Sequence, residues 1–576
     1  IGTDSSGNSN TWSTSSMGDS DVLLDTPTNN FCTYNSLHNG STVLTQGNLK
    51  FVNSSGNSDT GCTMQIPFTG KWYWEIRATA VDAMYYGIVR TSYSDTAGTY
   101  SSLGRKVLYD GKYWNGSSSV SYGSSYSDGD IVNVAFDCDN SKLYFGKNGT
   151  WQNSGDPANG TNPAGTVTAS DGWVPNMYGN SGTQNDLNFG QNGTFNGTVT
   201  AQGNTDGNGY GNFYYSPPTG FLALCTKNLS TPTIKKPTEH FNTVIYTGSD
   251  DDTVSQNVTG VGFQPDLVWI KKRNATAHHV LTDAVRGATK ALNSNQNVAE
   301  VDDTYGVTAF GSDGFTVREQ ASAGGQVNTG TLVAWNWKAG GSGSADTSGD
   351  IDATVSANTT AGFSIVTFTA DGSNSGTIPH GLGVVPKIAI KKDRDSTGDW
   401  HVRTTVIDGS DDYLVLNTDV DVSTFSASYG SMTSQFVTNS ASTNGSSEMF
   451  YVFAEVEGFS KFSTYTGNGS TNGPYVCTGF RPGFVMYKRT NDLPGKSGEA
   501  GRWQVLDTKR DPSNVTETGV SWNTAFAENS GGGYWDIDIL SNGFKLRTTE
   551  VETNGSGGIF FYMAFAEFPF KYANAR

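Results

Sequence analysis

Few residues in this sequence have the types and spacing that metal binding requires. His278 and His279 are adjacent in a stretch that reads as a strand. Neighbouring side chains of a strand point to opposite faces, so the two imidazoles are poorly placed to hold one metal ion. The acidic run "SDDDT" at 249–253 is either a Ca²⁺-binding loop or, more simply, a solvated loop. We therefore expect no metal site and no cofactor, with Ca²⁺ at this loop as the one exception.

An acidic and a basic residue recur at a fixed spacing. Asp283 and Arg286 reappear as Asp507 and Arg510, whereas the corresponding middle stretch has Asp408 and no arginine. A pair three residues apart after a strand is typical of a salt bridge in a turn. The sequence also contains no G-x-S-x-G, H-E-x-x-H or phosphate-binding loop motif. We expect a protein that is not an enzyme.

Composition limits the class of protein and its partners. The chain has 576 residues, enough for several domains, and a net charge of −18, which argues against nucleic acid as a partner. No apolar run approaches the roughly 18 residues of a membrane-spanning helix, so we expect no membrane insertion. Short apolar runs alternate with Asn-Gly, Asp-Gly and Gly-Ser pairs, and this pattern predicts a nearly all-β protein.

The cysteines do not form a recognisable framework. Their number is odd and their spacing wide, and no C-x-x-C pair is present, so neither a disulfide framework nor a structural zinc site is expected. We interpret them as small buried apolar residues. They are Cys32, Cys62, Cys138, Cys225 and Cys477.

Five segments of the first part of the chain appear in an order that resembles the SPRY domain, a concanavalin-like β-sandwich. The resemblance covers about residues 31–222. It implies a binding module that recognises its partner through loops and that carries no chemistry. The segments are "KWYWEIRATA" at 71–80, "KVLYDGKYWNGS" at 106–117, "DGDIVNVAFDCDNSKLYFGKNGTW" at 128–151, "GWVPNMY" at 172–178 and "DLNFGQNGTF" at 186–195.

Three aromatic residues in this part are candidates for ligand binding. Tyr113, Trp114 and Trp151 lie at predicted hairpin tips, where a binding loop would be. The alternative is that they pack on their own domain. Trp72 and Trp74 alternate along one strand, so we expect them in the core with Phe136 and Phe145 rather than on a ligand platform.

A glycan hydrolase on a similar sandwich is a further alternative. Its laminarinase-like relatives carry Glu-x-Asp-x-x-Glu on one strand, because hydrolysis needs two carboxylates about 5–10 Å apart. Here Glu75 is alone on its strand, with Arg77 two residues on. We expect Glu75 to lie at a strand edge, solvated or in a salt bridge.

The rest of the chain contains three copies of one pattern. Each copy opens with a short strand, reaches an apolar strand after Pro265, Pro386 or Pro482, and ends in an aromatic-rich strand. The repeat of roughly 100–120 residues suits a β-sandwich. We expect three tandem sandwiches with stiff joints in an elongated body, and the stretch "KAGGSGSADTSGD" at 338–350 as the one flexible break.

The predicted boundaries follow from these patterns. Residues 1–30 form an N-terminal connector, 31–222 the SPRY-like sandwich, 223–240 a Pro-containing linker, and 241–341, 342–459 and 460–576 the three repeats. The opening "IGTDSSGNSNTW" reads like the middle of a protein, so we expect sequence upstream of Ile1.

The repeat resembles modules of large structural proteins of tailed phages, particularly marine ones. The resemblance is carried by "GFQPDLVWIKKR", "VLTDAVRGATK", "FGSDGFTV" and "LVAWNWKAGG", and it is strongest within 241–341. It implies a virion context rather than an activity. We expect a tail fibre or surface appendage, at the virion surface or otherwise extracellular, that binds a host surface glycan or protein. The alternative is a subunit of a cellular extracellular filament or adhesin.

The expected assembly is a homo-oligomer that also contacts other virion proteins. Many exposed β-domains present edge strands that need cover. A closed trimer or a helical filament would supply that cover.

Overall fold

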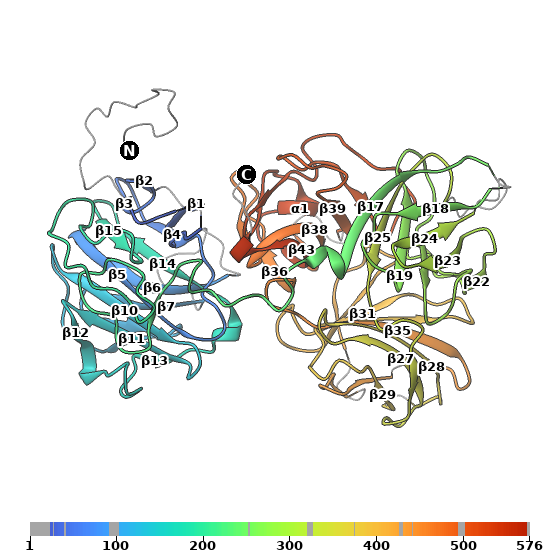
Figure 1. The fold of residues 1–576 in the computed structure, drawn as a ribbon, viewed down its shortest axis with the longest axis horizontal. Helices are drawn as coiled ribbons and strands as arrows, with labels where there is room; N and C mark the ends of the chain where they lie inside the picture. Colours follow the sequence, from blue (N-terminus) through green and yellow to red (C-terminus); the bar gives the residue numbers. More distant parts are fainter. Residues whose placement is uncertain are drawn as a thin grey trace, which may run out of the picture. The chain divides into compact units, whose positions relative to one another are not determined.

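A computed structural model gives the fold of two compact units, residues 1–230 and 231–576 (Figure 1). The described secondary structure is almost entirely strands, with one short helix, α1 (Val551–Asn554), and a few 3-10 turns. The predicted all-β class is confirmed. The structure describes residues 23–26, 28–39, 42–91, 103–251, 254–318, 327–373, 375–425, 430–439, 442–493 and 501–572.

The N-terminal unit is a sandwich of two sheets. One has the order β1 (Tyr34–Asn39), β4 (Ser58–Cys62), β14 (Trp173–Gly179), β6 (Tyr85–Arg90), β7 (Gly104–Leu108), β8 (Lys112–Trp114), β9 (Ser119–Ser121). The other has the order β12 (Thr150–Trp151), β11 (Lys142–Lys147), β10 (Ile131–Asp137), β5 (Lys71–Ala80), β15 (Gln184–Asn188), β3 (Lys50–Val52), β2 (Val43–Thr45). In this second sheet β13 (Gly165–Thr166) pairs with β11, and β16 (Leu222–Ala223) runs parallel to β5.

The aromatic side chains of β5 belong to the core of this sandwich, as predicted. Trp72 and Trp74 are 3% and 0% exposed, and Phe136 and Phe145 are fully buried. The indole of Trp74 stacks on Phe189, with ring centroids 5.7 Å apart. The opening tryptophans therefore pack the fold and do not form a ligand platform.

The C-terminal unit contains three groups of strands with one strand order. We call residues 241–341 module 1, 342–459 module 2 and 460–576 module 3; these boundaries stay predictions. We number the four common strands of each main sheet by their order along the chain. In space, the first strand lies beside the fourth, the fourth beside the second, and the second beside the third. The main sheets are β17 (Phe241–Thr247), β25 (Thr331–Trp337), β19 (Leu267–Lys272), β20 (Val280–Asp283) in module 1; β28 (Phe363–Thr369), β35 (Ser447–Phe453), β30 (Ile388–Asp393), β31 (His401–Thr404) in module 2; and β36 (Ser460–Thr466), β43 (Ile559–Pro569), β38 (Phe480–Arg489), β39 (Gln504–Asp507) in module 3.

Smaller sheets and added strands complete the modules. The second sheets are β18 (Gln256–Thr259), β24 (Gly314–Val317), β23 (Val307–Gly311) in module 1; β29 (Thr377–Pro379), β34 (Phe436–Thr438) in module 2; and β37 (Tyr475–Cys477), β42 (Gly543–Leu546), β41 (Ile537–Leu540) in module 3. Module 1 also has a pair, β21 (Lys290–Ala291) and β22 (Val301–Asp302). The main sheets of modules 2 and 3 extend through β32 (Asp412–Val415), β33 (Ser423–Thr424) and β40 (Val520–Ser521), and β26 (Ser344–Asp346) and β27 (Ala353–Asn358) add to the free edge of β28.

The strand registers of the three modules coincide. Leu267, Ile388 and Phe484 each pair with an aromatic residue of their module's last strand. The repeated prolines lie two residues before them, just before the strand or at a bulge, where a missing N–H is tolerated. Pro265, Pro386 and Pro482 are thus equivalent in register.

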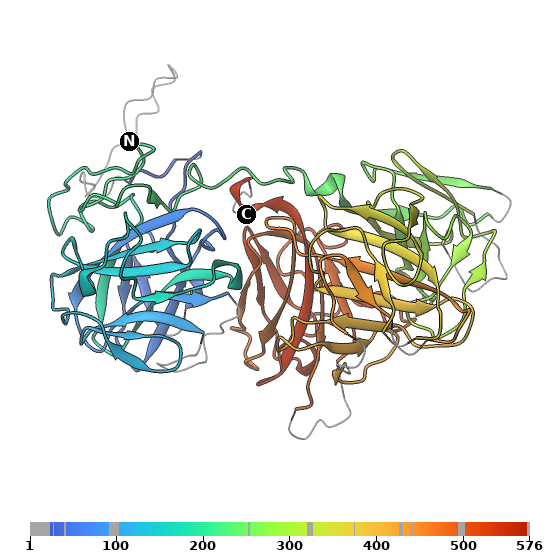
Figure 2. The same ribbon diagram turned by 90° about the horizontal axis from the view of Figure 1, so that it is seen from below.

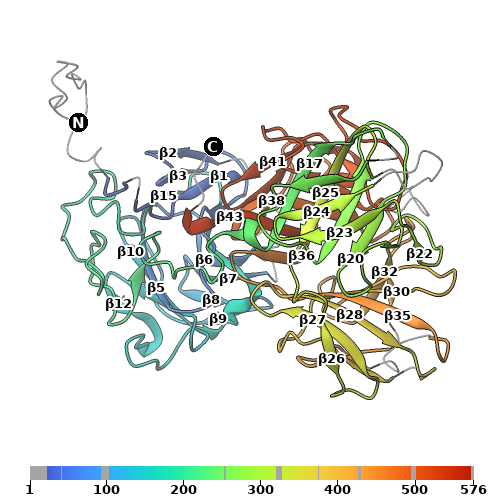
Figure 3. The same ribbon diagram turned by 45° about the vertical axis from the view of Figure 1, so that its right-hand side comes forward.

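The three modules share one apolar core. It combines side chains from all three, with Trp269 and Trp335 from module 1, Trp400 from module 2 and Trp503 and Trp522 from module 3. The rings of Trp269 and Trp522 stack with their centroids 3.9 Å apart. Figure 3 shows the three groups of strands packed side by side, in green, yellow and orange-red.

The expected elongated row of independent sandwiches is therefore wrong for this unit. Each main sheet is apolar on both faces: Phe484 and Met486 of β38 face the shared core, while Val485 and Tyr487 face the core of module 3 itself. Near-continuous apolar runs are typical of strands covered on both sides. The expected flexible break at 338–350 is also wrong, because β26 lies within it and pairs with β27 (Figure 3). Figure 2 shows the strands of this unit from below.

The close approach of β6 and β7 in the N-terminal unit depends on a glycine, Gly87. A Cβ on Gly87 of β6 would lie 2.0 Å from the carbonyl oxygen of Arg105 and 2.8 Å from the Cα of Lys106. We expect Gly87→Ala to cost about 1–3 kcal/mol, because β7 backbone must move. Hydrogen exchange of β6 and β14 in the intact chain should accelerate accordingly.

The matched control is Gly207→Ala, whose new Cβ meets no heavy atom within 4 Å. Equal exchange of β6 in both variants would show that the strand spacing tolerates the methyl group.

Candidate functional site

Glu75 is a fully buried carboxylate of the N-terminal unit and lies on the central strand β5, not at an edge. It has no ion-pair partner among the described residues. Its oxygens instead accept hydrogen bonds from the Tyr73 hydroxyl (2.9 Å), the Asn188 amide (3.1 Å) and the backbone N–H groups of Tyr214 (2.9 Å) and Tyr215 (2.7 Å). The expectation of a solvated or salt-bridged Glu75 is wrong.

These bonds give Glu75 a structural task. Burial raises its pKa to about 7, and the four donors act in the opposite direction by favouring the charged form. Through its bonds to the two backbone N–H groups, the carboxylate holds the segment around Tyr214 and Tyr215 against one face of β5. Trp74 lies on the opposite face of that strand. This cover explains why both faces of β5 are buried.

The three aromatic candidates for ligand binding fall in two different sheets. Tyr113 on β8 is 2% exposed and packs against Tyr122 and Phe145. Trp114, its neighbour, is half-buried against a small cluster of apolar side chains. Trp151 on β12 is half-buried and meets the rings of Tyr73 and Tyr144 edge-on. Ligand binding by these residues stays a prediction, for which Trp114 and Trp151 offer exposed surface.

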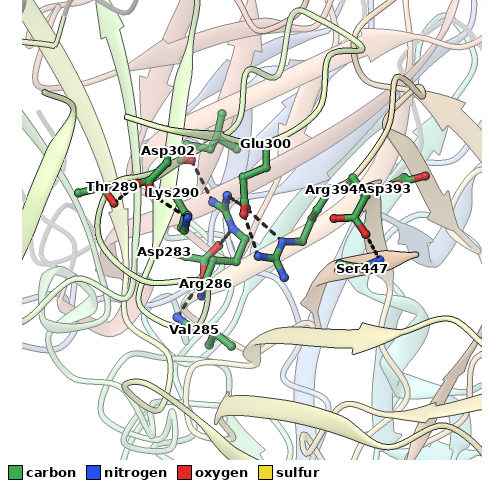
Figure 4. A network of polar contacts seen from close by, with 12 residues as sticks. Asp283, Val285, Arg286, Thr289, Lys290, Glu300, Asp302, Asp393, Arg394 and Ser447 are labelled. Carbon is green, nitrogen blue, oxygen red and sulfur yellow. Dashed lines mark hydrogen bonds and ion pairs between the residues drawn. The ribbon is translucent and has the colours of Figure 1, made fainter. Parts of the chain in front are cut away.

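The contact between modules 1 and 2, which we call the 1–2 seam, contains a buried ion network (Figure 4). Asp283 and Arg286 have fully buried side chains that pair with each other, and the Tyr451 hydroxyl of module 2 donates to Asp283 at 2.8 Å. Arg286 also forms an ion pair with Glu300 at 2.8 Å. Arg394 of module 2 donates two hydrogen bonds to the same carboxylate, from Nε and from Nη2. Although burial opposes its charge, the neighbouring Asp283 raises the pKa of Arg286.

The 3–1 seam repeats this network. Asp507 and Arg510 of module 3 pair at 2.6 Å, and the Trp335 indole of module 1 donates to Asp507 at 3.1 Å. Glu528 binds Arg510 and, through both oxygens, Arg273 of module 1. The predicted turn salt bridges are therefore present, and each one also joins two modules.

The 2–3 seam has apolar or neutral residues at the same positions. Register places Thr404 where the other modules have Asp283 and Asp507, so Asp408 is not the counterpart. The arginine and glutamate positions hold Ile407 and Val422, which pack against the shared core. The backbone contact persists: Val422 N–H donates to Thr490 at 3.1 Å, as Glu300 does to Arg394 at 2.8 Å. One seam thus replaces the ion network with apolar packing.

Sequence reasoning missed the partners across the seams. Tyr451 and Trp335 occupy one equivalent position in the last strands, and Met563 occupies it in module 3. The sequence did contain a signal for the two arginines that bind across the seams. Arg273 and Arg394 end the stretches "IKKR" and "IKKDR" in modules 1 and 2, and module 3 has Thr490 at the equivalent position.

His279 is a buried hydrogen-bonding group at another equivalent position. Its Nδ1 accepts from the Trp269 indole at 3.0 Å, so the proton is on Nε2, which contacts the Ser521 carbonyl of module 3 at 3.0 Å. Trp400 and Trp503 make the same bond to the neighbouring module, each donating its indole N–H at 3.0 Å to a carbonyl oxygen. Burial holds the pKa of His279 well below its usual value.

The other metal candidates have ordinary partners. His278 contacts the amides of Asn295 and Gln296. In the acidic loop, Asp250 accepts the Gly330 N–H at 2.9 Å, and residues 252–253 lie outside the described part. In the described ranges no three His, Cys, Asp or Glu side chains are grouped to hold a metal ion.

Two further expectations concern the cysteines and membranes. The five cysteines are buried, as predicted, and none of them forms a disulfide bond in the structure. A search of the described helices found none that is both long and apolar enough to span a bilayer.

Comparisons with known proteins identify both units. A family model described as "Domain of unknown function (DUF7483)" matches residues 236–569, more than half of the chain. The chain belongs to this family. The three modules and their shared core therefore make up the DUF7483 unit. A SPRY domain model matches residues 71–167, within the predicted range 31–222, so the SPRY resemblance is confirmed there.

Solved structures similar to the chain include two SPRY domains and a toxin. The SPRY domain of human HERC1 is 15% identical, with a TM-score of 0.22, over 27% of this chain and 96% of that one. A human SPRY domain is 18% identical, with a TM-score of 0.21, over 26% and 95%. The stonustoxin structure is 14% identical, with a TM-score of 0.22, over 27% of each chain. No curated protein matches the sequence.

The ion network predicts a ranking of variants in the DUF7483 unit. Arg286→Met leaves the buried Asp283 carboxylate without its cation, and we expect it to cost about 3–5 kcal/mol in the free energy of unfolding. Asp283→Thr with Arg286→Ile copies the residues of the 2–3 seam and should cost less. Urea denaturation of the intact chain measures both. A double variant as unstable as Arg286→Met would contradict this reading.

His279 predicts a pH dependence. Its folded pKa is depressed, so the unfolded state takes up more protons below pH 6.5 and stability falls as the pH falls through that value. The loss should approach about 1.4 kcal/mol per pH unit. His279→Gln does not titrate, so its stability difference from the native chain should shrink between pH 7.5 and 5. A constant difference would show that His279 is not the titrating group.

Proposed function

We propose that the chain is a structural and recognition protein of a virion, a tail fibre or other surface appendage of a phage, that binds a host surface glycan or protein. The observation that carries the proposal is the pairing of a SPRY domain, a protein-interaction module, with a closed DUF7483 unit. The resemblance of the repeats to phage structural modules supports the virion context.

The DUF7483 unit suits the task of a scaffold. Its three sheets are buried on both faces and are joined by two ion networks and one apolar seam. Rigid elements that carry loops are a common basis for recognition. We propose that activity is confined to binding, and that homo-oligomers and other virion proteins protect exposed edges such as β9.

Particle imaging tests the virion half. Antibodies against the chain should label the tail or an appendage of phage particles whose genome encodes it, in negatively stained electron micrographs. Label on cellular filaments in uninfected cultures would instead place the chain in an extracellular filament or adhesin.

Cell binding tests the recognition half. The purified chain should bind host cells and release no soluble saccharide from their surface polysaccharides. Trp114→Ala and Trp151→Ala should weaken that binding if the SPRY loops make the contact, since exposed aromatic side chains supply stacking area. Release of oligosaccharides by the isolated chain would contradict the non-enzymatic part.

A further inference from the structure

The surface of module 2 has a recess of about 340 Å³ beside the 1–2 seam. Its position follows from the hairpin of β26 and β27, which widens the main sheet beyond β28. The described parts of modules 1 and 3 have no strands that pair with the outer edge of their first strand. The lining residues that matter here are Thr347, Asp352, Thr354, Thr367, Thr369, Arg394 and Ser447.

Hydroxyl groups dominate this lining. Cross-strand pairing places Thr354 opposite Thr367 and Thr369 opposite Ser447, so side chains of three strands share one face. Among the described residues, these hydroxyls and that of Thr347 make no side-chain hydrogen bond to the protein. The recess therefore offers several groups that can each donate and accept.

Two charged groups flank the hydroxyls, and one is held rigidly. Glu300 binds Nε and Nη2 of Arg394 at 3.1 and 2.8 Å, which fixes the guanidinium plane and leaves Nη1 with no partner in the described structure. The Asp352 carboxylate is exposed and likewise has no protein partner among the described residues. The ion network of the seam thus fixes the guanidinium of a residue that lines the recess.

We propose that this recess binds a neutral saccharide. Sugar hydroxyls both donate and accept, and they match a lining of hydroxyls with one carboxylate and one guanidinium. The volume is at the small end of ligand sites, enough for one or two sugar rings. Glu300 offsets the charge of Arg394, Asp352 adds a negative charge and the chain carries −18 overall, so an anionic sugar is disfavoured. This inference rests on the proposed recognition function and names a ligand class and site for it.

The probe is an array of defined neutral and sulfated oligosaccharides, followed by titration of the intact chain with the free sugar that binds. We expect at least one neutral oligosaccharide to bind. The variant Asp352→Asn with Thr367→Val and Thr369→Val should lose about tenfold or more in affinity, because it removes several hydrogen-bonding groups at once. These replacements keep the side-chain shapes.

Thr247→Val is the matched control. Thr247 ends the first strand of module 1 as Thr369 ends that of module 2, and it is exposed outside the recess. It should leave sugar affinity unchanged. Binding of sulfated sugars alone, no sugar binding, or undiminished affinity in the triple variant would overturn the proposal.

Cell binding separates this inference from the proposed function. If the triple variant no longer binds either the sugar or the host cells, both the recess proposal and the recognition proposal stand. If the triple variant keeps its affinity for the sugar, or if no neutral sugar binds, while the intact chain binds host cells, the recess proposal fails and recognition stands. If the intact chain binds neither sugar nor cells, both proposals fail.

Discussion

Burial of the main sheets on both faces is the constraint on which the C-terminal unit depends. Each sheet has one apolar face turned to its own module and a second turned to the shared core. A module alone would expose side chains such as Trp269, Trp400 or Trp503 to water, and burial of each large apolar side chain is worth roughly 1.5–3 kcal/mol. The three modules therefore need one another, and the second apolar face makes a closed arrangement more stable than a row.

The seams show how one backbone arrangement accepts two kinds of side-chain chemistry. Two seams use a buried aspartate, arginine and glutamate, and the third uses Thr404, Ile407 and Val422 with the same backbone contact. Replacing a buried ion pair by apolar groups is often neutral for stability. The ion network has a second effect at the 1–2 seam, because it orients Arg394 beside the hydroxyl-lined recess.

Much of the fold could be predicted from the sequence. Strand-length apolar runs and turn pairs indicated an all-β chain, and the spacing of Pro265, Pro386 and Pro482 indicated three equivalent modules. The shared core was missed, although the near-continuous run "LVWI" at 267–270 is typical of a strand covered on both faces. Glu75 was misread because its partners, Tyr214 and Tyr215, lie about 140 residues further along the chain. Local patterns cannot report such contacts. The recess likewise arises from a hairpin whose first strand, β26, lies in a Gly- and Ser-rich stretch that reads as a linker.

The central claim is that the three modules of the DUF7483 unit fold as one body around the shared core. Native-state hydrogen exchange at increasing urea concentration tests it directly, because amides that open together share one free energy and one denaturant slope. Amides in the central strands β19, β30 and β38 should converge on a single opening reaction. Three separate opening reactions, one for each module, would contradict the account.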